Sequence, residues 1–262
     1  MEPRRAVPVA IADEARFAGR LATDAVRLLL ELRERHADQH PDGPDVKALK
    51  DAGDRTSHEF LVAALAEARP SDAVLSEEGA DDPARLDADR VWIVDPLDGT
   101  REYGETGRTD WAVHVALWAG GELSSSAVAL PGLAEVLVTD PAPALPARGG
   151  GPVRIAVSRT RPPAEADAVA RALEAELVPL GSAGYKALAV VRGEVDAYVH
   201  TGGMYQWDSA APVAVARAAG LVTCRIDGSP LVYNAAELSL PDLVVCRPEL
   251  VEPILAAVRA GR

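Results

Sequence analysis

Two aspartates stand three residues apart in residues 95–100 (Asp-Pro-Leu-Asp-Gly-Thr), a spacing that suits metal-assisted chemistry. The apolar run Val91–Val94 before them predicts a buried strand that ends at Asp95. Pro96 turns the chain there, and Gly99 permits a close backbone approach. Carboxylates that share one pocket repel each other unless a cation lies between them. Because all-oxygen ligands select hard cations, the segment predicts a site for Mg²⁺ or Mn²⁺.

Other acidic residues could join this site. Glu77-Glu78 follows the short apolar run Ala73–Leu75, Asp208 lies at the start of a predicted helix, and Asp54 opens another. Each also has a structural interpretation, because an aspartate at a helix start is a common N-cap and a pair of glutamates is often solvated. The residues alone leave both interpretations open. The haloacid-dehalogenase phosphatases are a poor match, because their two aspartates are two residues apart and lie near the N-terminus.

Hydrophobic periodicity predicts the elements that position these residues. The sequence predicts helices over 10–37, 55–68, 164–177, 207–219 and 253–259, and strands over 91–94, 111–118, 124–130, 134–138, 153–157, 221–225 and 243–246. The strands over 111–138 form an expected antiparallel meander. A helix breaker is expected at 40–44, and the Pro/Gly/Ala-rich segment 140–152 is the expected boundary between two halves. The mixture of strands and helices indicates an α/β or α+β protein.

Composition and net charge exclude several classes of protein and of binding partner. The chain has 262 residues, is 48% hydrophobic and carries a net charge of -13, which fits a globular protein and excludes a disordered one. So acidic a chain is not expected to bind nucleic acid polymers or anionic membranes, whereas small anions could bind through metal ions. Two cysteines do not make a disulfide framework. The first ten residues lack the apolar stretch of a signal peptide, so a cytoplasmic protein is expected.

Three blocks in this order resemble the inositol monophosphatase superfamily of lithium-sensitive, magnesium-dependent phosphatases. They are Glu77-Glu78, residues 95–100, and residues 207–211 (Trp-Asp-Ser-Ala-Ala) followed by Ala-Ala-Gly at 218–220. The likeness spans about residues 48–246. Four further segments are similar to the 3'(2'),5'-bisphosphate nucleotidases of the CysQ type: residues 101–103 (Arg-Glu-Tyr), 157–160 (Val-Ser-Arg-Thr), 181–186 (Gly-Ser-Ala-Gly-Tyr-Lys) and 227–234 (Asp-Gly-Ser-Pro-Leu-Val-Tyr-Asn).

The resemblance implies an α/β (α+β) fold, a layered α/β/α/β/α sandwich of the inositol monophosphatase and sugar phosphatase type. Its N-terminal half, residues 1–148, would carry most metal ligands. Its C-terminal half, residues 149–262, would carry Asp208 and the substrate-side residues. Two positions depart from the family pattern: Asp51 replaces a threonine, and Arg161 replaces a histidine.

The resemblance also implies the roles of individual residues, with two or three Mg²⁺ ions and Mn²⁺ as an alternative. One ion would be held by Glu77, Asp95 and the Leu97 carbonyl, a second by Asp95, Asp98 and Asp208, and a weaker third near Glu77 and Asp54. Asp54 and Thr100 would be catalytic and orient a metal-activated water. The expected substrate-binding residues are Gly99, Thr100, Lys186, Ser158, Arg159 and Ser182. Tyr103 and Tyr185 are candidates to stack on a base. His58, His114 and His200 have no partner at ligand spacing and are expected to be ordinary.

The implied activity is removal of the 3'-phosphate from adenosine 3',5'-bisphosphate or 3'-phosphoadenylyl sulfate, in sulfur assimilation. Two alternatives stay open: hydrolysis of inositol-1-phosphate or fructose-1,6-bisphosphate, and a catalytically silent, metal-binding regulatory relative. The expected partner is a small phosphorylated molecule, with no nucleic acid polymer and no membrane. Because relatives commonly pair, a homodimer is a further expectation.

Overall fold

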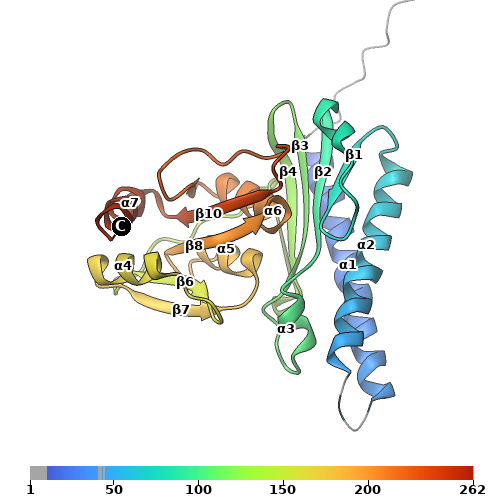
Figure 1. The fold of residues 1–262 in the computed structure, drawn as a ribbon, viewed down its shortest axis with the longest axis horizontal. Helices are drawn as coiled ribbons and strands as arrows, with labels where there is room; N and C mark the ends of the chain where they lie inside the picture. Colours follow the sequence, from blue (N-terminus) through green and yellow to red (C-terminus); the bar gives the residue numbers. More distant parts are fainter. Residues whose placement is uncertain (1–10, 41–42, 44, 262) are drawn as a thin grey trace, which may run out of the picture.

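The computed structural model describes residues 11–40, 43 and 45–261, which form five layers (Figure 1). Two helices, α1 and α2, cover the outer face of a first sheet. Helices α5 and α6 lie between this sheet and a second one, whose far side carries α4 and α7 (Figure 1). The layered α/β/α/β/α sandwich is therefore confirmed. The expected features of residues 1–10 and of 41–42 and 44 lie outside the described residues.

The first sheet carries the segment rich in aspartate. Its strand order is β1-β2-β3-β4-β5, with β1 parallel to β2 and the others antiparallel, so the expected meander is confirmed. The strands are β1 Ala73–Ser76, β2 Arg90–Asp98, β3 Ala112–Ala119, β4 Glu122–Leu130 and β5 Glu135–Val138. The helices α1 (Ile11–Gln39) and α2 (Val46–Ala68) bury apolar residues against it. Short helices follow β1, β2 and β4: η1 Pro83–Asp87, α3 Thr100–Gly104 and η2 Pro131–Leu133.

The second sheet has the order β7-β6-β8-β10-β9. Its strands are β6 Arg154–Ser158, β7 Glu176–Leu180, β8 Ala197–Tyr205, β9 Val222–Cys224 and β10 Ser239–Cys246. The associated helices are α4 Ala164–Leu173, α5 Ala183–Val191, α6 Gln206–Ala218, η3 Pro248–Leu250 and α7 Val251–Ala260. Cys224 and Cys246 are free and buried. None of the helices in the described part of the chain has the length and apolar character needed to cross a membrane.

Two expected boundaries are wrong. Helix α2 begins at Val46 rather than at residue 55, because the Asp45 side chain accepts a hydrogen bond from Ala48 N (3.0 Å) and caps the helix there. The helix expected over 164–177 ends at Leu173, because Glu174 adopts the left-handed conformation (φ 50°). Residues 176–180 then form β7, a parallel partner of β6. Here hydrogen bonding of residues 176–180 to β6 outweighs the helical periodicity of the sequence.

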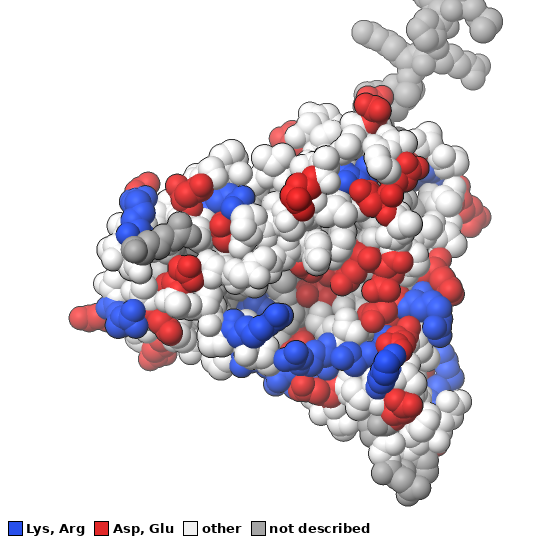
Figure 2. Space-filling model, in the orientation of Figure 1, with Lys and Arg blue, Asp and Glu red and all other residues white. Residues whose placement is uncertain are grey.

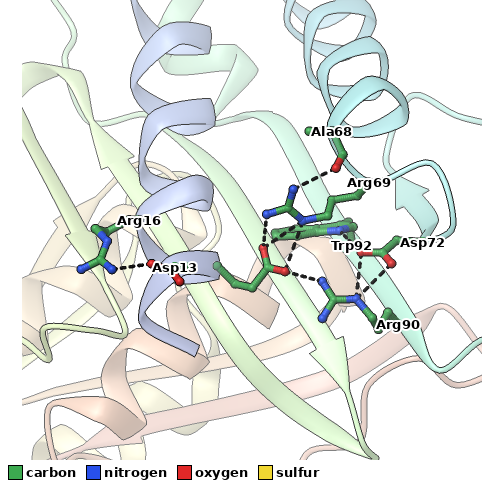
Figure 3. Close-up of polar contacts among 8 residues, drawn as sticks. Asp13, Arg16, Ala68, Arg69, Asp72, Arg90 and Trp92 are labelled. Atoms are coloured by element: carbon green, nitrogen blue, oxygen red, sulfur yellow. Dashed lines mark hydrogen bonds and ion pairs between the residues drawn. The ribbon is translucent and has the colours of Figure 1, made fainter. Parts of the chain in front are cut away.

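A buried ion-pair network fixes α1 to the first sheet. The Glu14 carboxylate, whose residue is 1% exposed, accepts hydrogen bonds from Arg69 Nη2 (2.9 Å) and Arg90 Nη2 (2.6 Å). Arg90 also donates to Asp72, which accepts a hydrogen bond from Trp92 Nε1 (2.9 Å; Figure 3). The two arginines satisfy a carboxylate that burial would otherwise destabilise.

We expect Glu14→Gln to lower the free energy of unfolding by about 2–4 kcal/mol, because it leaves Arg69 without its buried counter-charge and Arg90 with Asp72 alone. Asp13→Asn is the matched control. Asp13 pairs with Arg16 on the exposed side of the same helix turn, where an ion pair contributes about 0–1 kcal/mol (Figure 3). Urea unfolding of both variants checks this. Equal effects of the two substitutions would show that the network contributes no more than a surface pair.

Candidate active site

Strand β2 ends in an irregularity that places its two aspartates. Its pairing with β3 shifts register between Asp95 and Asp98, and the expected strand extends to Asp98. Gly99 follows in the left-handed conformation (φ 88°) and begins α3. A Cβ atom at this position would lie 3.1 Å from Ser182 Cβ and 3.2 Å from Trp111 Cβ, so there is little room for a side chain. The turn therefore needs glycine for both its conformation and its packing.

Asp95 is the most deeply buried of the clustered carboxylates, with 1% of its surface exposed. Its Oδ1 accepts a hydrogen bond from Leu97 N (3.0 Å), whereas its Oδ2 is buried without a hydrogen-bond partner. Burial and then the neighbouring Glu77 and Asp98 raise its pKa well above the ordinary value. The raised pKa values of Asp95 and Glu77 favour a proton on one of the two carboxyl groups.

Asp98 is held by the other half of the molecule. Its carboxylate accepts hydrogen bonds from Ala183 N (3.0 Å), Gly184 N (2.6 Å) and the Ser182 hydroxyl at the start of α5. Burial alone would raise its pKa, but His114 and then the Ser182 hydroxyl and Lys186 outweigh burial and lower it to about 2. Asp98 is therefore a permanent anion at the junction of the two sheets.

The role of His114 was missed in the sequence. It is fully buried on β3, with Nε2 3.2 Å from Asp98 Oδ2 and Nδ1 3.1 Å from the Trp207 carbonyl. Burial opposes a charge on the ring, but Asp98 outweighs burial and raises the histidine pKa. A Cβ on residue 184 would lie 2.0 Å from Nε2, so Gly184 is required for this approach. The one available signal was a histidine inside an otherwise apolar strand.

The two residues expected to be catalytic are in contact. Thr100 Oγ1 lies 3.2 Å from Asp54 Oδ1 and 3.1 Å from the Leu97 carbonyl oxygen, so its single proton can be donated to either. Partial burial and then Glu78 raise the Asp54 pKa to about 6. A half-buried carboxylate with this pKa, beside a hydroxyl, can act as a base near neutral pH.

Glu77 and Asp208 complete the acidic group at its edge. Glu77 is exposed. Partial desolvation is the largest cause that raises its pKa, to about 7, and contact with solvent weakens this effect. Asp208 Oδ2 accepts a hydrogen bond from Tyr205 N (2.6 Å), while burial and Asp98 raise its pKa to about 6. The structure thus brings the expected acidic residues of three separate blocks to the end of β2.

A pocket of about 310 Å³ opens beside Asp98 and Asp208, between the two halves. It is lined by all the expected substrate-binding residues: Gly99, Thr100, Lys186, Ser158, Arg159 and Ser182. On this face of the molecule, acidic side chains gather directly above a band of Lys and Arg side chains (Figure 2). The arrangement offers positive charge to an anion next to the carboxylates.

The two tyrosines considered for base stacking are engaged elsewhere. Tyr103 is fully buried, packs edge-on against Trp111 at 5.1 Å between ring centroids, and donates its hydroxyl to the Leu29 carbonyl (2.9 Å). The Tyr185 ring carries the guanidinium of Arg192 at 5.0 Å from its centroid.

The donor set fits a hard divalent cation. In the part of the chain that the structure describes, no three His, Cys, Asp or Glu side chains are already arranged to hold a metal ion. Asp98 and Asp208 accept hydrogen bonds from N–H and O–H donors instead. The unpartnered, buried Asp95 Oδ2 and the raised pKa values of Asp95 and Glu77 indicate that these oxygens lack a neighbouring positive charge. Carboxylate and carbonyl oxygens are the ligands that Mg²⁺ prefers.

Comparisons with known proteins identify the fold and family of the chain. Residues 12–142 and 151–260 match the inositol monophosphatase family. The chain is 50% identical over 258 residues to the 3'-phosphoadenosine 5'-phosphate phosphatase of Mycobacterium leprae, covering 94% of this chain and 93% of that protein. It is 30% identical to the 3'(2'),5'-bisphosphate nucleotidase CysQ of Escherichia coli, covering 71% and 80%. The crystal structure of CysQ from Bacteroides thetaiotaomicron superposes with a TM-score of 0.76 at 27% identity, covering 90% and 97%.

We expect the metal-free protein to lose stability as the pH rises from about 4 to about 7. The folded pKa values of Asp54, Glu77 and Asp208 (about 6, 7 and 6) lie above the ordinary values, so the folded state holds protons that the unfolded chain releases. Added Mg²⁺ at about 100 times its Kd should then raise Tm by about 5–10 °C at pH 8. Thermal unfolding in EDTA and in Mg²⁺, at pH 5 and pH 8, checks this. A larger Mg²⁺ effect at pH 5 than at pH 8 would contradict it.

Proposed function

The chain belongs to the inositol monophosphatase family, and we propose that it removes the 3'-phosphate of adenosine 3',5'-bisphosphate in a Mg²⁺-dependent hydrolysis. The observation that carries this proposal is the 50% identity, over nearly the whole chain, to a phosphatase named for that substrate. The pocket supports it, because basic residues line its wall next to the carboxylates that suit Mg²⁺. 3'-Phosphoadenylyl sulfate, which carries a similar pair of anionic groups, is the second proposed substrate.

Asp95, Glu77, Asp98, Asp208 and the Leu97 carbonyl are the residues that would hold two Mg²⁺ ions. A third would lie near Glu77 and Asp54, and Mn²⁺ is the alternative ion. Bound Mg²⁺ supplies positive charge to the phosphate and lowers the pKa of water. Asp98 and Asp208 would exchange their present N–H and O–H donors for the cation. This exchange links cation binding to the position of the 182–184 segment, which donates to Asp98.

The chain's own residues position the water and take its proton. We assign Asp54 as the general base, because its pKa of about 6 keeps it mostly ionised at neutral pH while leaving it able to accept a proton. When the Thr100 hydroxyl donates to Asp54 or to the Leu97 carbonyl, its oxygen lone pairs are left to accept a hydrogen bond from that water. The backbone N–H groups of Gly99 and Thr100 are assigned to phosphate oxygens, because Gly99 has no side chain to block the approach.

The remaining substrate contacts follow from the pocket wall. Ser158, Arg159, Ser182 and Lys186 surround the space beside the carboxylates, and we propose that they form the wall of the nucleotide site, Arg159 and Lys186 while keeping the contacts they already make. A cytoplasmic location, a place in sulfur assimilation, inhibition by lithium and a homodimer remain predictions from the resemblance.

The proposed function is tested by measuring phosphate release from three substrates side by side in Mg²⁺. Adenosine 3',5'-bisphosphate is expected to exceed inositol-1-phosphate and fructose-1,6-bisphosphate by about 100-fold in kcat/KM, a preference of about 2.7 kcal/mol. Lithium should inhibit all three reactions. Asp98→Asn should abolish turnover, and Asp89→Asn, at an exposed aspartate remote from the pocket, serves as its control. Equal or faster hydrolysis of the sugar phosphates would contradict the nucleotide assignment, while no turnover of any substrate would favour the silent regulatory relative.

Replacing Thr100 tests the proposed role of the Asp54–Thr100 pair. Thr100→Ala is expected to lower kcat by about 100- to 10,000-fold with a small change in KM, because positioning a proton acceptor contributes in this range. Thr100→Ser keeps the hydroxyl and should recover most of the rate. Steady-state kinetics of both variants measure the difference. If alanine and serine are equally defective, the hydroxyl is not the group that matters.

A further inference from the structure

The pocket contains more positive charge than one phosphate needs, and the structure divides this charge into engaged and free groups. Four Lys and Arg residues line it: Arg101, Arg159, Arg161 and Lys186. Arg159 is engaged, because its Nε donates to Glu102 (2.6 Å) and its Nη2 to Glu105 (2.6 Å), both near α3 in the other half. Moving it to a ligand would break two ion pairs.

Lys186 is engaged as well. The residue is 5% exposed, and its ammonium group donates to the carbonyl oxygens of Gly181 (3.2 Å) and Ser182. The Tyr198 ring lies 5.3 Å below the ammonium nitrogen. Burial lowers the Lys186 pKa to about 8, although several acidic neighbours act to raise it. In this arrangement Lys186 fixes the 181–184 segment that holds Asp98, and its hydrogen-bond donors point to the backbone.

The side chains of Arg101 and Arg161 are exposed, and among the described residues neither makes a hydrogen bond or an ion pair. They lie on different elements. Arg101 follows Thr100 on α3, next in the chain to one member of the proposed catalytic pair, so we assign its charge to the phosphate that reacts. Arg161 follows β6 in the other half, close enough to His200 on the pocket wall to lower the pKa of that ring.

The backbone at Arg161 is held in place. Its N–H lies 3.2 Å from Ser158 Oγ, to which it donates, and Pro162 and Pro163 follow before α4 begins at Ala164. Prolines restrict the backbone of the residue before them as well as their own, so the turn presents the side chain with little loss of backbone freedom. A free arginine on a restricted turn suits a phosphate, because its planar group donates two parallel hydrogen bonds.

We infer that Arg161, with the neighbouring Thr160 and His200, binds the second phosphate of the substrate, the one that is not hydrolysed. This inference rests on the proposed function and adds a residue to it. Arg161 then selects nucleotides that carry two phosphate groups over those with a single 3'-phosphate.

The test compares adenosine 3',5'-bisphosphate with adenosine 3'-monophosphate, which lacks the second phosphate. For Arg161→Gln, kcat/KM on the bisphosphate is expected to fall about 10- to 100-fold, mainly through KM, because a charge-assisted bidentate contact is lost. On the monophosphate the fall is at most about threefold. Arg161→Lys, which keeps the charge without the planar group, should recover part of the loss. Arg259→Gln, at an exposed position on α7, removes the same charge far from the pocket and controls for net charge.

Three results would overturn the inference: equal losses on both substrates, no loss on either, or a loss specific to the bisphosphate in Arg101→Gln instead. The wild-type protein separates this inference from the proposed function. If it does not hydrolyse the bisphosphate, the proposed function fails, and calorimetric binding of that nucleotide decides the role of Arg161. Equal affinity of wild type and Arg161→Gln would then overturn it, and a tenfold weaker Kd in the variant would support it.

Discussion

Glu77, Asp95 and Asp98 meet at the end of β2, where burial makes repulsion between like charges costly. Much of the surrounding structure reduces that cost. The raised pKa values of Glu77 and Asp95 favour a proton on one of the two, which halves the negative charge of that pair. Backbone N–H groups together with His114 stabilise Asp98 as an anion. A hydrolytic site that relies on metal ions needs this unfavourable group of oxygens in advance, so that a cation relieves repulsion when it binds. The same repulsion explains why the cluster stands where two sheets can both contribute donors.

The two halves are joined through charged side chains as well as through a common apolar core. Asp98 on the first sheet accepts hydrogen bonds from the start of α5. Arg159, which follows β6 of the second sheet, donates hydrogen bonds to Glu102 and Glu105. At another point, buried Arg85 donates to the Asn234 side chain (2.7 Å) and to the Ala235 carbonyl (3.0 Å). Because buried polar groups tolerate little misalignment, such contacts define how the halves meet. The pocket takes its shape from that junction.

Much of the site was predictable from the sequence because its chemistry is local. Residues 95–100 combine a strand end, a turn and candidate ligands in six positions, so one short pattern predicts both the local structure and the candidate site. The meander was predictable for a similar reason, since its apolar runs and the Gly and Pro turns between them are short-range signals. Three features depended on distant partners and were not predictable: strand β7, which needs β6 beside it, the role of His114, and the engagement of Arg159 by Glu102 and Glu105. Helical periodicity over 164–177 was misleading because the same apolar residues also suit a half-buried edge strand.

The scarcity of lysine and the burial of Lys186 have a practical consequence for work on the molecule. The sequence has three lysines, and the other two, Lys47 and Lys50, lie in the first turn and a half of α2. The Lys47 side chain is 85% exposed, whereas the Lys186 ammonium group is covered by backbone carbonyls. Amine-reactive dyes or surface-coupling reagents would therefore modify lysine side chains at one end of one helix. Immobilisation through these amines would orient the molecule and leave the pocket chemically unmodified.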